Sequence, residues 1–384
     1  MSTTVVQTRP HPTHHRRRGA PLLVAAVALA IVGASLPAGG ATTTRKTTKA
    51  TKATPKPTTK PAETPTTVKL KSGKLRLGFF PNVTHAPALV GVEKGLYSAA
   101  LGPDVKLETY SFNAGPAAVE ALFSGAIDAA YVGPNPAATA FARSKGKAIR
   151  IIAGSTSGGA FLVVKPGINS VADLKGKKLA TPQLGGTQDI ALRYFLKSKG
   201  LSSTVEGGGD VSILPQENAQ TLETFRAGGI DGAWVPEPWA TRLVAEAGAR
   251  VLVDERDLWP KQSFTTTILI VRTDFLKDRP DIVEALLQGH VAAVDFTVNN
   301  PTKAQDAANS QIEKLTGKKL AASVISNSWV NLTFTNDPEI STIKVGAQHA
   351  TDVGLLDKTD LTGIEDLTLL NKVLAAAGKP TVSD

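Results

Sequence analysis

The sequence predicts an α/β protein with two lobes and a cleft between them, and three observations support this fold class. Short apolar strands alternate with helical segments from Leu75 onward, a rhythm that indicates a mostly parallel sheet covered by helices on both faces. The same rhythm restarts after Pro166, which indicates a second sheet. The chain from Asp274 to Ala377 is predicted to be helical, and these helices are expected to return to the first lobe.

The expected elements follow the chain in two matching series. In the first we expect strands at 75–80, 105–112, 129–132 and 149–153, and helices at 86–94, 116–123 and 137–144. In the second we expect strands at 178–181, 211–214, 232–235 and 251–253, and helices at 187–199, 219–227 and 239–247. The last helices are predicted at 280–298, 303–315, 321–327, 339–353 and 366–376.

Two further β-type runs, at 161–164 and 265–271, flank the second series. We expect them to cross between the lobes and form a hinge. The predicted division is therefore lobe 1 over 74–166 and 261–384, and lobe 2 over 167–260. Lobe 1 is discontinuous in sequence because the C-terminal helices complete it.

The net charge of +10 comes from the N-terminal tail. Residues 1–74 contain 13 Lys and Arg and one acid, whereas the rest of the chain contains 30 Lys and Arg against 32 Asp and Glu. The folded part is nearly neutral, so we expect no nucleic-acid partner. The sequence has no cysteine, which excludes disulfides, thiolate metal sites and cysteine nucleophiles.

An export segment is predicted at residues 1–41. Three arginines at 16–18 precede an apolar run from Pro21 to Leu36, and small residues follow it, which is the pattern of a signal peptide. The run from 19 to 41 is also long enough to remain as a membrane anchor, and the sequence leaves both alternatives open. Lipoprotein attachment is excluded without a Cys. Residues 42–73, mainly Thr, Lys and Pro, are predicted to form a disordered linker.

Three strand-to-helix turns share one chemistry, because each places Gly, Pro or a small polar residue at a helix start: Asn113-Ala-Gly-Pro116, Gly133-Pro-Asn-Pro136 and Gly185-Gly-Thr187. A helix N-terminus exposes unpaired N–H groups and carries a partial positive charge, so it attracts anions. In open α/β sheets such turns meet at the carboxyl ends of the strands. The turns therefore predict a small anion as ligand, with ordinary helix capping as the alternative for each turn.

The sequence resembles the type II periplasmic binding proteins of the nitrate/sulfonate/taurine importer group, most closely the aliphatic-sulfonate binders. The residues that carry the resemblance are Leu77-Gly-Phe-Phe-Pro-Asn-Val-Thr-His-Ala-Pro-Ala-Leu89, Glu93-Lys-Gly-Leu96, Phe112-Asn-Ala-Gly-Pro-Ala-Ala-Val-Glu-Ala-Leu122, Gly125-Ala-Ile-Asp128, Asp173-Leu-Lys-Gly-Lys177, Gln220-Thr-Leu-Glu223 and Gly229-Ile-Asp-Gly-Ala-Trp-Val-Pro-Glu-Pro-Trp239. The resemblance implies two lobes that close on one ligand. It also implies delivery of that ligand to an ABC permease driven by an ATPase.

A sulfonate site needs N–H and O–H donors because the ligand is always charged and has no proton to donate. Candidate residues on lobe 1 are Asn82, Thr84, His85, Asn113, Gly115, Asn135, Thr156 and Ser157; on lobe 2 they are Gln183, Thr187, Gln188, Trp234, Glu237 and Trp239. His85 could instead be a buried structural residue, and the two tryptophans could be core rather than a wall for the alkyl part. Glu237 would repel a bare sulfonate, so it either meets an amine, as in taurine, or orients a neighbouring donor.

Other chemistry is not indicated. The six histidines are scattered, and His11, His14 and His15 precede the apolar run, so no metal site is expected. Neither a phosphate-binding loop nor a Gly-x-Ser-x-Gly elbow is present. A pyrimidine-forming enzyme branch shares the fold, but its active site resembles a cysteine-rich segment that this chain lacks. We therefore expect a monomeric binding protein without a cofactor, located in the periplasm or on the outer face of the cell membrane.

Overall fold

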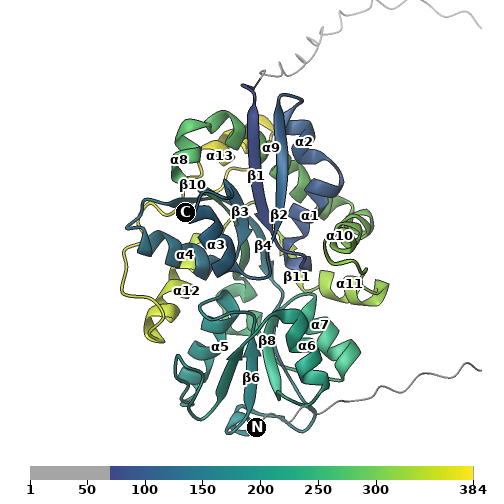
Figure 1. Ribbon diagram of the computed structural model, residues 1–384, viewed down its shortest axis with the longest axis vertical. Helices are drawn as coiled ribbons and strands as arrows, with labels where there is room; N and C mark the ends of the chain where they lie inside the picture. The colour runs from purple at the N-terminus through teal and green to yellow at the C-terminus, as the bar shows by residue number, and fades with distance from the viewer. Residues whose placement is uncertain (1–69, 384) are drawn as a thin grey trace, which may run out of the picture. The chain divides into compact units, whose positions relative to one another are not determined.

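Two β-sheets organise the computed structural model, which describes residues 70–383. Each sheet is the centre of one lobe, and the two lobes meet near the middle of the body in Figure 1. We call the lobe around the six-stranded sheet lobe 1 and the lobe around the five-stranded sheet lobe 2. The export segment predicted at 1–41 and the linker predicted at 42–73, apart from its last four residues, lie outside the described residues.

The sheet of lobe 1 has the strand order β11-β4-β10-β3-β1-β2. Its strands are β1 (Gly73–Phe79), β2 (Val105–Ser111), β3 (Ala129–Val132), β4 (Ile149–Gly158), β10 (Thr265–Arg272) and β11 (Leu332–Phe334). β1 is parallel to β2 and β3, whereas β10 lies antiparallel between β3 and β4. Leu269 and Val271 of β10 are buried on one face, and Ile268 and Ile270 on the other. Successive side chains of a strand point to opposite faces of the sheet, and here both faces are apolar. Helices must therefore cover both faces.

The sheet of lobe 2 has the order β7-β6-β8-β5-β9. Its strands are β5 (Ala160–Val164), β6 (Lys178–Thr181), β7 (Ser212–Pro215), β8 (Gly232–Pro236) and β9 (Arg250–Asp254). β6 is parallel to β7 and β8, and β5 is antiparallel to β8 and β9. Each lobe therefore contains a parallel βα core with strands that run against it, β10 and β11 in lobe 1 and β5 in lobe 2.

Helices cover both faces of each sheet. Lobe 1 holds α1 (Ala86–Glu93), α2 (Leu96–Leu101), α3 (Gly115–Phe123), α4 (Pro134–Arg143), α8 (Thr273–Asp278), α9 (Pro280–Asn299), α10 (Pro301–Thr316), α11 (Ala322–Trp329), α12 (Ile340–Asp352) and α13 (Thr368–Ala376). Lobe 2 holds α5 (Thr187–Ser198), α6 (Asn218–Arg226) and α7 (Trp239–Ala247). In Figure 1 the green and yellow C-terminal helices lie beside the purple and blue N-terminal strands. Lobe 1 is therefore discontinuous in sequence.

The chain crosses between the lobes twice. The first crossing is at Gly158 and Gly159, between β4 and β5, and both glycines have positive φ, 77° and 74°. The second runs from β9 to β10 through two 3-10 turns at Glu255–Leu258 and Pro260–Gln262. β5 already pairs within the second sheet, ahead of the boundary at residue 167 expected from the sequence. The exact lobe boundaries stay a prediction.

Three short elements were not expected from the sequence. α2 has six residues and starts after Gly95, and β11 has three residues; neither is long enough to show a period. α8 follows β10 directly, with no Gly or Pro to mark the change of structure. Between residues 70 and 383 the structure has no helix with the length and apolar composition to span a membrane.

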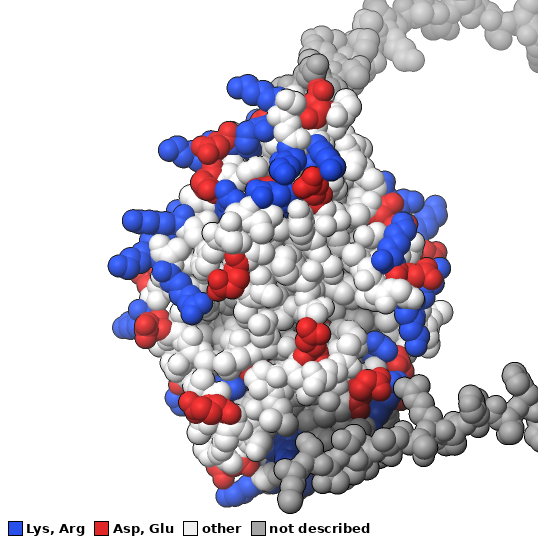
Figure 2. Space-filling model, viewed as in Figure 1, with Lys and Arg blue, Asp and Glu red and all other residues white. Residues whose placement is uncertain are grey.

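The face shown in Figure 2 has its Lys and Arg side chains mostly toward its edges. Its central part is largely uncharged, with a few acidic side chains. This central part spans the junction of the two lobes in the matching view of Figure 1, so on this face the surface at the junction carries few charged side chains.

Candidate functional site

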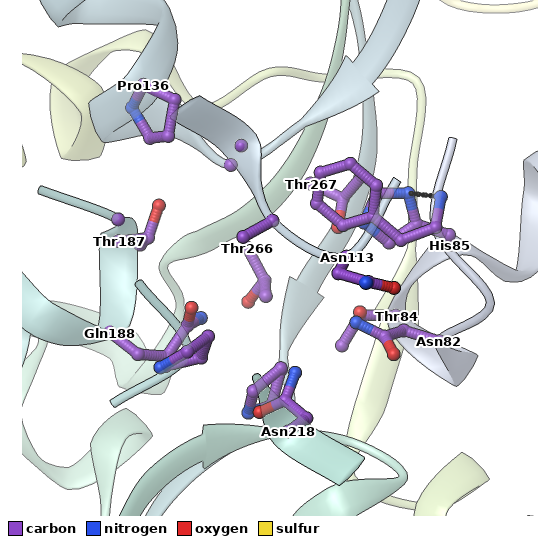
Figure 3. A pocket seen from close by; sticks show the side chains of 17 residues that line it. Asn82, Thr84, His85, Asn113, Pro136, Thr187, Gln188, Asn218, Thr266 and Thr267 are labelled. Atoms are coloured by element: carbon purple, nitrogen blue, oxygen red, sulfur yellow. Dashed lines mark hydrogen bonds between the residues drawn. The ribbon is translucent and has the colours of Figure 1, made fainter. Parts of the chain in front are cut away.

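A small cavity lies between the lobes, where the helices that follow the parallel strands begin. Its lining residues are Phe80, Asn82, Thr84, His85, Asn113, Ala114, Gly115, Gly133, Pro136, Pro182, Gly186, Thr187, Gln188, Asn218, Pro236, Thr266 and Thr267. Figure 3 shows Asn82, Thr84 and His85 on one side of it and Thr187 and Gln188 on the opposite side. The cavity offers about 40 Å³, and a water molecule needs at least about 10–15 Å³. It therefore has room for a ligand of only a few heavy atoms.

Four helices begin at this cavity. Two come from lobe 1, α3 and α4, and two come from lobe 2, α5 and α6; their lining residues are Gly115, Gly133, Thr187 and Asn218. None of the four starts has a side chain that caps a backbone N–H. The free N–H groups and the positive ends of the helix dipoles therefore favour a negative charge in the cavity.

Three buried polar atoms at the cavity have no hydrogen-bond partner among residues 70–383. They are the hydroxyls of Thr187 and Thr267 and the side-chain oxygen of Asn218. The three residues are 7%, 0% and 6% exposed. Buried polar groups are nearly always paired, because an unpaired one costs free energy. Two hydroxyls, which can donate, and one amide oxygen, which can only accept, are therefore available to a ligand.

His85 supplies a further donor that is neutral. Its Nδ1 accepts a hydrogen bond from the Phe80 N–H at 3.4 Å, so the ring proton belongs on Nε2. Burial lowers the pKa of His85 to about 3, since the imidazolium form would lose its hydration. His85 can thus donate one hydrogen bond without carrying a charge at any pH near neutrality.

None of the residues that line the cavity is Asp, Glu, Lys or Arg. Three acids adjoin lining residues in sequence, Asp189, Glu217 and Glu237, and none of them lines the cavity. Asp189, in the first turn of α5, is fully buried and forms an ion pair with Arg193 at 3.0 Å. Its other oxygen accepts the Thr181 hydroxyl at 2.8 Å. Because Asp189 is neutralised within lobe 2, an anion in the cavity meets neutral donors and no facing carboxylate.

Two glycines at the cavity are required by close packing. A Cβ on Gly133 would lie 2.3 Å from the Thr187 hydroxyl, across the lobe junction. A Cβ on Gly115 would lie 2.4 Å from Cγ of Pro136. Gly115 therefore allows α3 to pack on the start of α4, a different reason from the ligand approach expected from the sequence.

Seven of the fourteen residues predicted for the site line this cavity: Asn82, Thr84, His85, Asn113, Gly115, Thr187 and Gln188. The side chain of Asn113 also donates a hydrogen bond to Glu217 at 2.8 Å, an exposed contact between the lobes. Ligand contact by these seven residues stays a prediction that the geometry supports.

The other residues predicted on lobe 1 do not line the cavity. Asn135 donates to the Gly346 carbonyl at 2.7 Å and so joins α4 to α12. The Ser157 hydroxyl donates to the Phe264 carbonyl at 2.8 Å and fixes one crossing strand to the other. The Thr156 hydroxyl is buried without a partner, outside the cavity lining.

The remaining residues predicted on lobe 2 lie elsewhere too. Gln183 is half-buried in the loop before α5, and its carbonyl accepts the Gly186 N–H at 3.0 Å. Trp234 is fully buried in the core of lobe 2, where its indole N–H donates to Glu255 at 2.7 Å. Because β8 alternates its faces, Trp234 points into the core and not into the cleft.

Glu237 and Trp239 lie beside the cavity and contact lobe 1 directly. The Trp239 indole N–H donates to the Asn82 side chain at 2.8 Å. The Glu237 carboxylate accepts hydrogen bonds from Ser328 at 3.1 Å and Asn331 at 2.8 Å. These two side chains join protein to protein, which fits the alternative that Glu237 has a structural role. Ligand contact by Glu237 or Trp239 stays a prediction.

Ala114, Gly133, Pro136 and Gly186 belong to the three predicted turns, although they were not named as single candidates. The sequence reasoning missed six other cavity residues: Phe80, Pro182, Asn218, Pro236, Thr266 and Thr267. Two signals were available for the polar ones. Asn218 starts the helix after β7, the same strand-to-helix position as the three turns that were used. The run Thr265-Thr-Thr267 opens β10, directly after the second crossing between the lobes, and Thr266 and Thr267 line the cavity.

Known proteins of similar sequence are binding proteins. A candidate aliphatic sulfonates-binding protein of Bacillus subtilis is 26% identical over 309 residues, which is 78% of this chain and 88% of the relative. The taurine-binding periplasmic protein of Escherichia coli is 27% identical over 215 residues, 56% of this chain and 64% of the relative. This chain is therefore homologous to periplasmic solute-binding proteins.

Solved structures of similar fold include periplasmic binding proteins as well. The alkanesulfonate-binding protein SsuA from Xanthomonas axonopodis pv. citri, bound to MOPS, superposes with a TM-score of 0.63 at 20% identity, over 76% of this chain and 96% of that one. At that identity the likeness shows the fold, which is that of a type II periplasmic binding protein. The NMT1-like family matches residues 69–312, more than half of the sequence, and the chain therefore belongs to the NMT1-like family.

Proposed function

We propose that this protein is the extracytoplasmic solute-binding component of an ABC importer. It captures a small organic anion, an aliphatic sulfonate, and delivers it to a permease that an ATPase drives. The observation that carries this proposal is the cavity between the lobes, where four uncapped helix starts and unpartnered hydroxyls converge without a charged side chain. Donors fixed in this way suit an anion that is charged at every pH.

The composition of the cavity favours a plain sulfonate over taurine. The ammonium group of taurine would need a carboxylate or several carbonyl acceptors, and no acid lines the cavity. Its volume of about 40 Å³ favours a short alkyl chain. We therefore expect methanesulfonate and ethanesulfonate to bind better than taurine.

Nitrate is the second candidate, because the same small volume favours the smallest oxyanions. Nitrate is planar and has three acceptor oxygens, whereas a sulfonate adds an alkyl group that needs apolar contact. Phe80, Pro136, Pro182 and Pro236 supply apolar wall to the cavity and support the sulfonate. A thiamine-pyrimidine precursor has far more heavy atoms than this volume holds, so the geometry favours it least.

We infer binding without chemistry. The cavity has no lining carboxylate or lysine that could activate a hydroxyl, and its histidine is held neutral with one nitrogen already occupied. General acid–base catalysis needs a group whose pKa lies near the working pH. The protein should therefore release its ligand unchanged. We propose in addition that it works as a monomer.

Titration calorimetry of the purified protein with methanesulfonate, ethanesulfonate, taurine, nitrate and sulfate tests this function. A ligand present at a hundred times its dissociation constant should raise the free energy of unfolding by about 2.7 kcal/mol. Mass spectrometry of the released ligand should show it unaltered. Binding of none of the five anions, or conversion of one of them, would refute the proposal.

A further inference from the structure

Glu237 is a buried carboxylate at the junction of the lobes. It follows β8, precedes α7, and is 1% exposed. Thr241 of lobe 2 donates two hydrogen bonds to it, from its N–H at 3.1 Å and its hydroxyl at 2.8 Å. Lobe 1 donates two more, from the Ser328 hydroxyl at 3.1 Å and the Asn331 side chain at 2.8 Å. Half of the bonds to this carboxylate thus depend on the two lobes being together.

The two donors from lobe 1 have other partners within their own lobe. The Ser328 hydroxyl also lies 2.8 Å from the Val324 carbonyl, and the Asn331 amide also donates to the Asn327 carbonyl at 3.1 Å. A hydroxyl has one proton, so Ser328 can turn from Glu237 to Val324. The donors of lobe 1 therefore keep a partner when the lobes separate, and the contact with Glu237 can break and re-form.

The carboxylate gains most from this contact. An ionised carboxylate is costly to bury unless hydrogen bonds replace its hydration. All four of the hydrogen bonds that Glu237 accepts come from neutral groups. Each donor from lobe 1 therefore bears directly on whether Glu237 is more stable between the lobes or in water.

The segment around Glu237 also touches residues that line the cavity. The Thr84 N–H points to the Glu237 carbonyl at 3.4 Å, and the Trp239 indole donates to Asn82 at 2.8 Å. Asn82 and Thr84 line the cavity on one side, and Pro236 lines it from lobe 2. Holding Glu237 against lobe 1 therefore places the turn from Asn82 to His85 at the ligand.

We propose that Glu237, with Ser328 and Asn331, forms a latch that holds the lobes together around the ligand. This inference rests on the proposed function and makes Glu237 a positioning residue that does not touch the anion. The latch raises affinity because it raises the fraction of protein in the closed form. If the ligand binds only the closed form, its apparent affinity falls as the open fraction grows.

Asn331→Ala, Ser328→Ala and Glu237→Gln test the latch, with Ser326→Ala as the matched control. Ser326 lies on the same helix, is exposed, and donates only to the Ser323 carbonyl. We expect Asn331→Ala to weaken ethanesulfonate binding by roughly ten- to a hundred-fold, the range for a lost hydrogen bond to a charged group. Ser328→Ala should have a smaller effect because of its second partner, and Ser326→Ala should have none.

A distance measurement separates the latch from the choice of ligand. The chain has no cysteine, so spin labels attach only at introduced ones, such as Gln220→Cys on α6 and Lys303→Cys on α10, both exposed positions. Double electron–electron resonance measures the distribution of distances between the two labels. The population with the longer interlobe distance should be larger in Asn331→Ala than in the labelled parent, with and without ethanesulfonate. Glu237→Gln added to Asn331→Ala should cause little further change, because the two residues share one contact.

The two possible failures differ in their signatures. If ethanesulfonate does not bind the parent protein, the proposed ligand is wrong, and the distance distributions measured without ligand still decide the latch. If Asn331→Ala leaves both the distance distribution and the affinity unchanged, the latch is refuted whatever the ligand. Glu237→Gln can also weaken the start of α7 through its bonds to Thr241, so Asn331→Ala is the decisive variant.

Discussion

Two hollows lie between the lobes, and they differ in size and chemistry. The cavity at the helix starts offers about 40 Å³ and has no charged lining residue. A groove near the crossing segment offers about 660 Å³ and is lined by aromatic side chains and by charged groups of both signs, among them Trp259, Glu255, Glu339 and Lys261. The smaller hollow is the better candidate for an anion, because no carboxylate lines it beside its free donors, whereas the groove has three acids beside its two lysines.

α5 belongs to both hollows. Its first residue, Thr187, lines the cavity, and residues of its last turns, including Phe195 and Ser198, line the groove. The positive end of the helix dipole therefore faces the small hollow, and the other end faces the large one. The direction of α5 thus explains part of the electrostatic difference between the two hollows. Variants at its two ends test the two hollows separately.

The largest effect is expected from Thr187→Asp, which places a carboxylate in the cavity. Two like charges about 4 Å apart repel by about 4 kcal/mol near a protein surface, so affinity for the sulfonate should fall by roughly a thousand-fold. Ser198→Asp, at the groove end of α5, should leave affinity unchanged. Titration calorimetry measures both. Equal losses of affinity in the two variants would mean that the anion does not bind in the cavity.

A large effect on stability is expected in the groove. Burial raises the pKa of Glu255 to about 7 from 4.5, so the folded protein holds a proton there that the unfolded chain releases above pH 4.5. The contribution of Glu255 to the free energy of unfolding is fully present below pH 4.5. As the pH rises from 4.5 to 7, the free energy of unfolding falls by about 3 kcal/mol.

Glu255→Gln should remove this dependence. The glutamine oxygen can still accept the Trp234 indole N–H, so the variant should be more stable than the parent at pH 8 and similar to it at pH 4.5. Asp257→Asn, an exposed acid on the same turn, is the control. Urea unfolding at the two pH values checks this, and an equal gain at both would show that titration of Glu255 is not the cause.

Gly133→Ala should have an intermediate effect that is confined to the cavity. The backbone of Gly133, with φ −72° and ψ 158°, suits alanine, so the change acts through its Cβ, 2.3 Å from the Thr187 hydroxyl. Overpacking of this kind costs about 1–3 kcal/mol, which predicts roughly a ten- to hundred-fold loss of affinity. Gly208→Ala, where the Cβ meets nothing closer than 3.6 Å, should bind like the parent protein.

The smallest effect is expected when ligand affinity is measured as a function of pH. Burial lowers the pKa of His85 from 6.5 to about 3, so its imidazole stays neutral at every pH well above 3. Affinity for ethanesulfonate, which also does not titrate, should therefore stay constant within about two-fold from pH 5 to pH 8. A rise in affinity toward pH 5 would show that His85 becomes an imidazolium and attracts the anion by charge.

Much of the fold could be predicted from the sequence, because strands and helices have local periods. The expected strand at 129–132 and helix at 239–247 coincide with β3 and α7, and the strand at 178–181 with β6. The restart after Pro166 correctly indicated a second sheet. The turns predicted to bind the anion could be found in the same way, since a Gly or Pro at a helix start depends on neighbours in sequence alone.

The tertiary structure decided which side chains of those elements meet. Trp234 and Glu237 are three residues apart at the end of β8, yet one is buried within lobe 2 and the other bonds to lobe 1. No local pattern indicates that α11, far along the chain, brings Ser328 and Asn331 to Glu237. The position of β10 between β3 and β4, which brings Thr266 and Thr267 to the cavity, is likewise set by long-range pairing. The sequence by itself therefore determined the elements and the chemistry of their ends, and only the packing of distant segments decided which ends share one cavity.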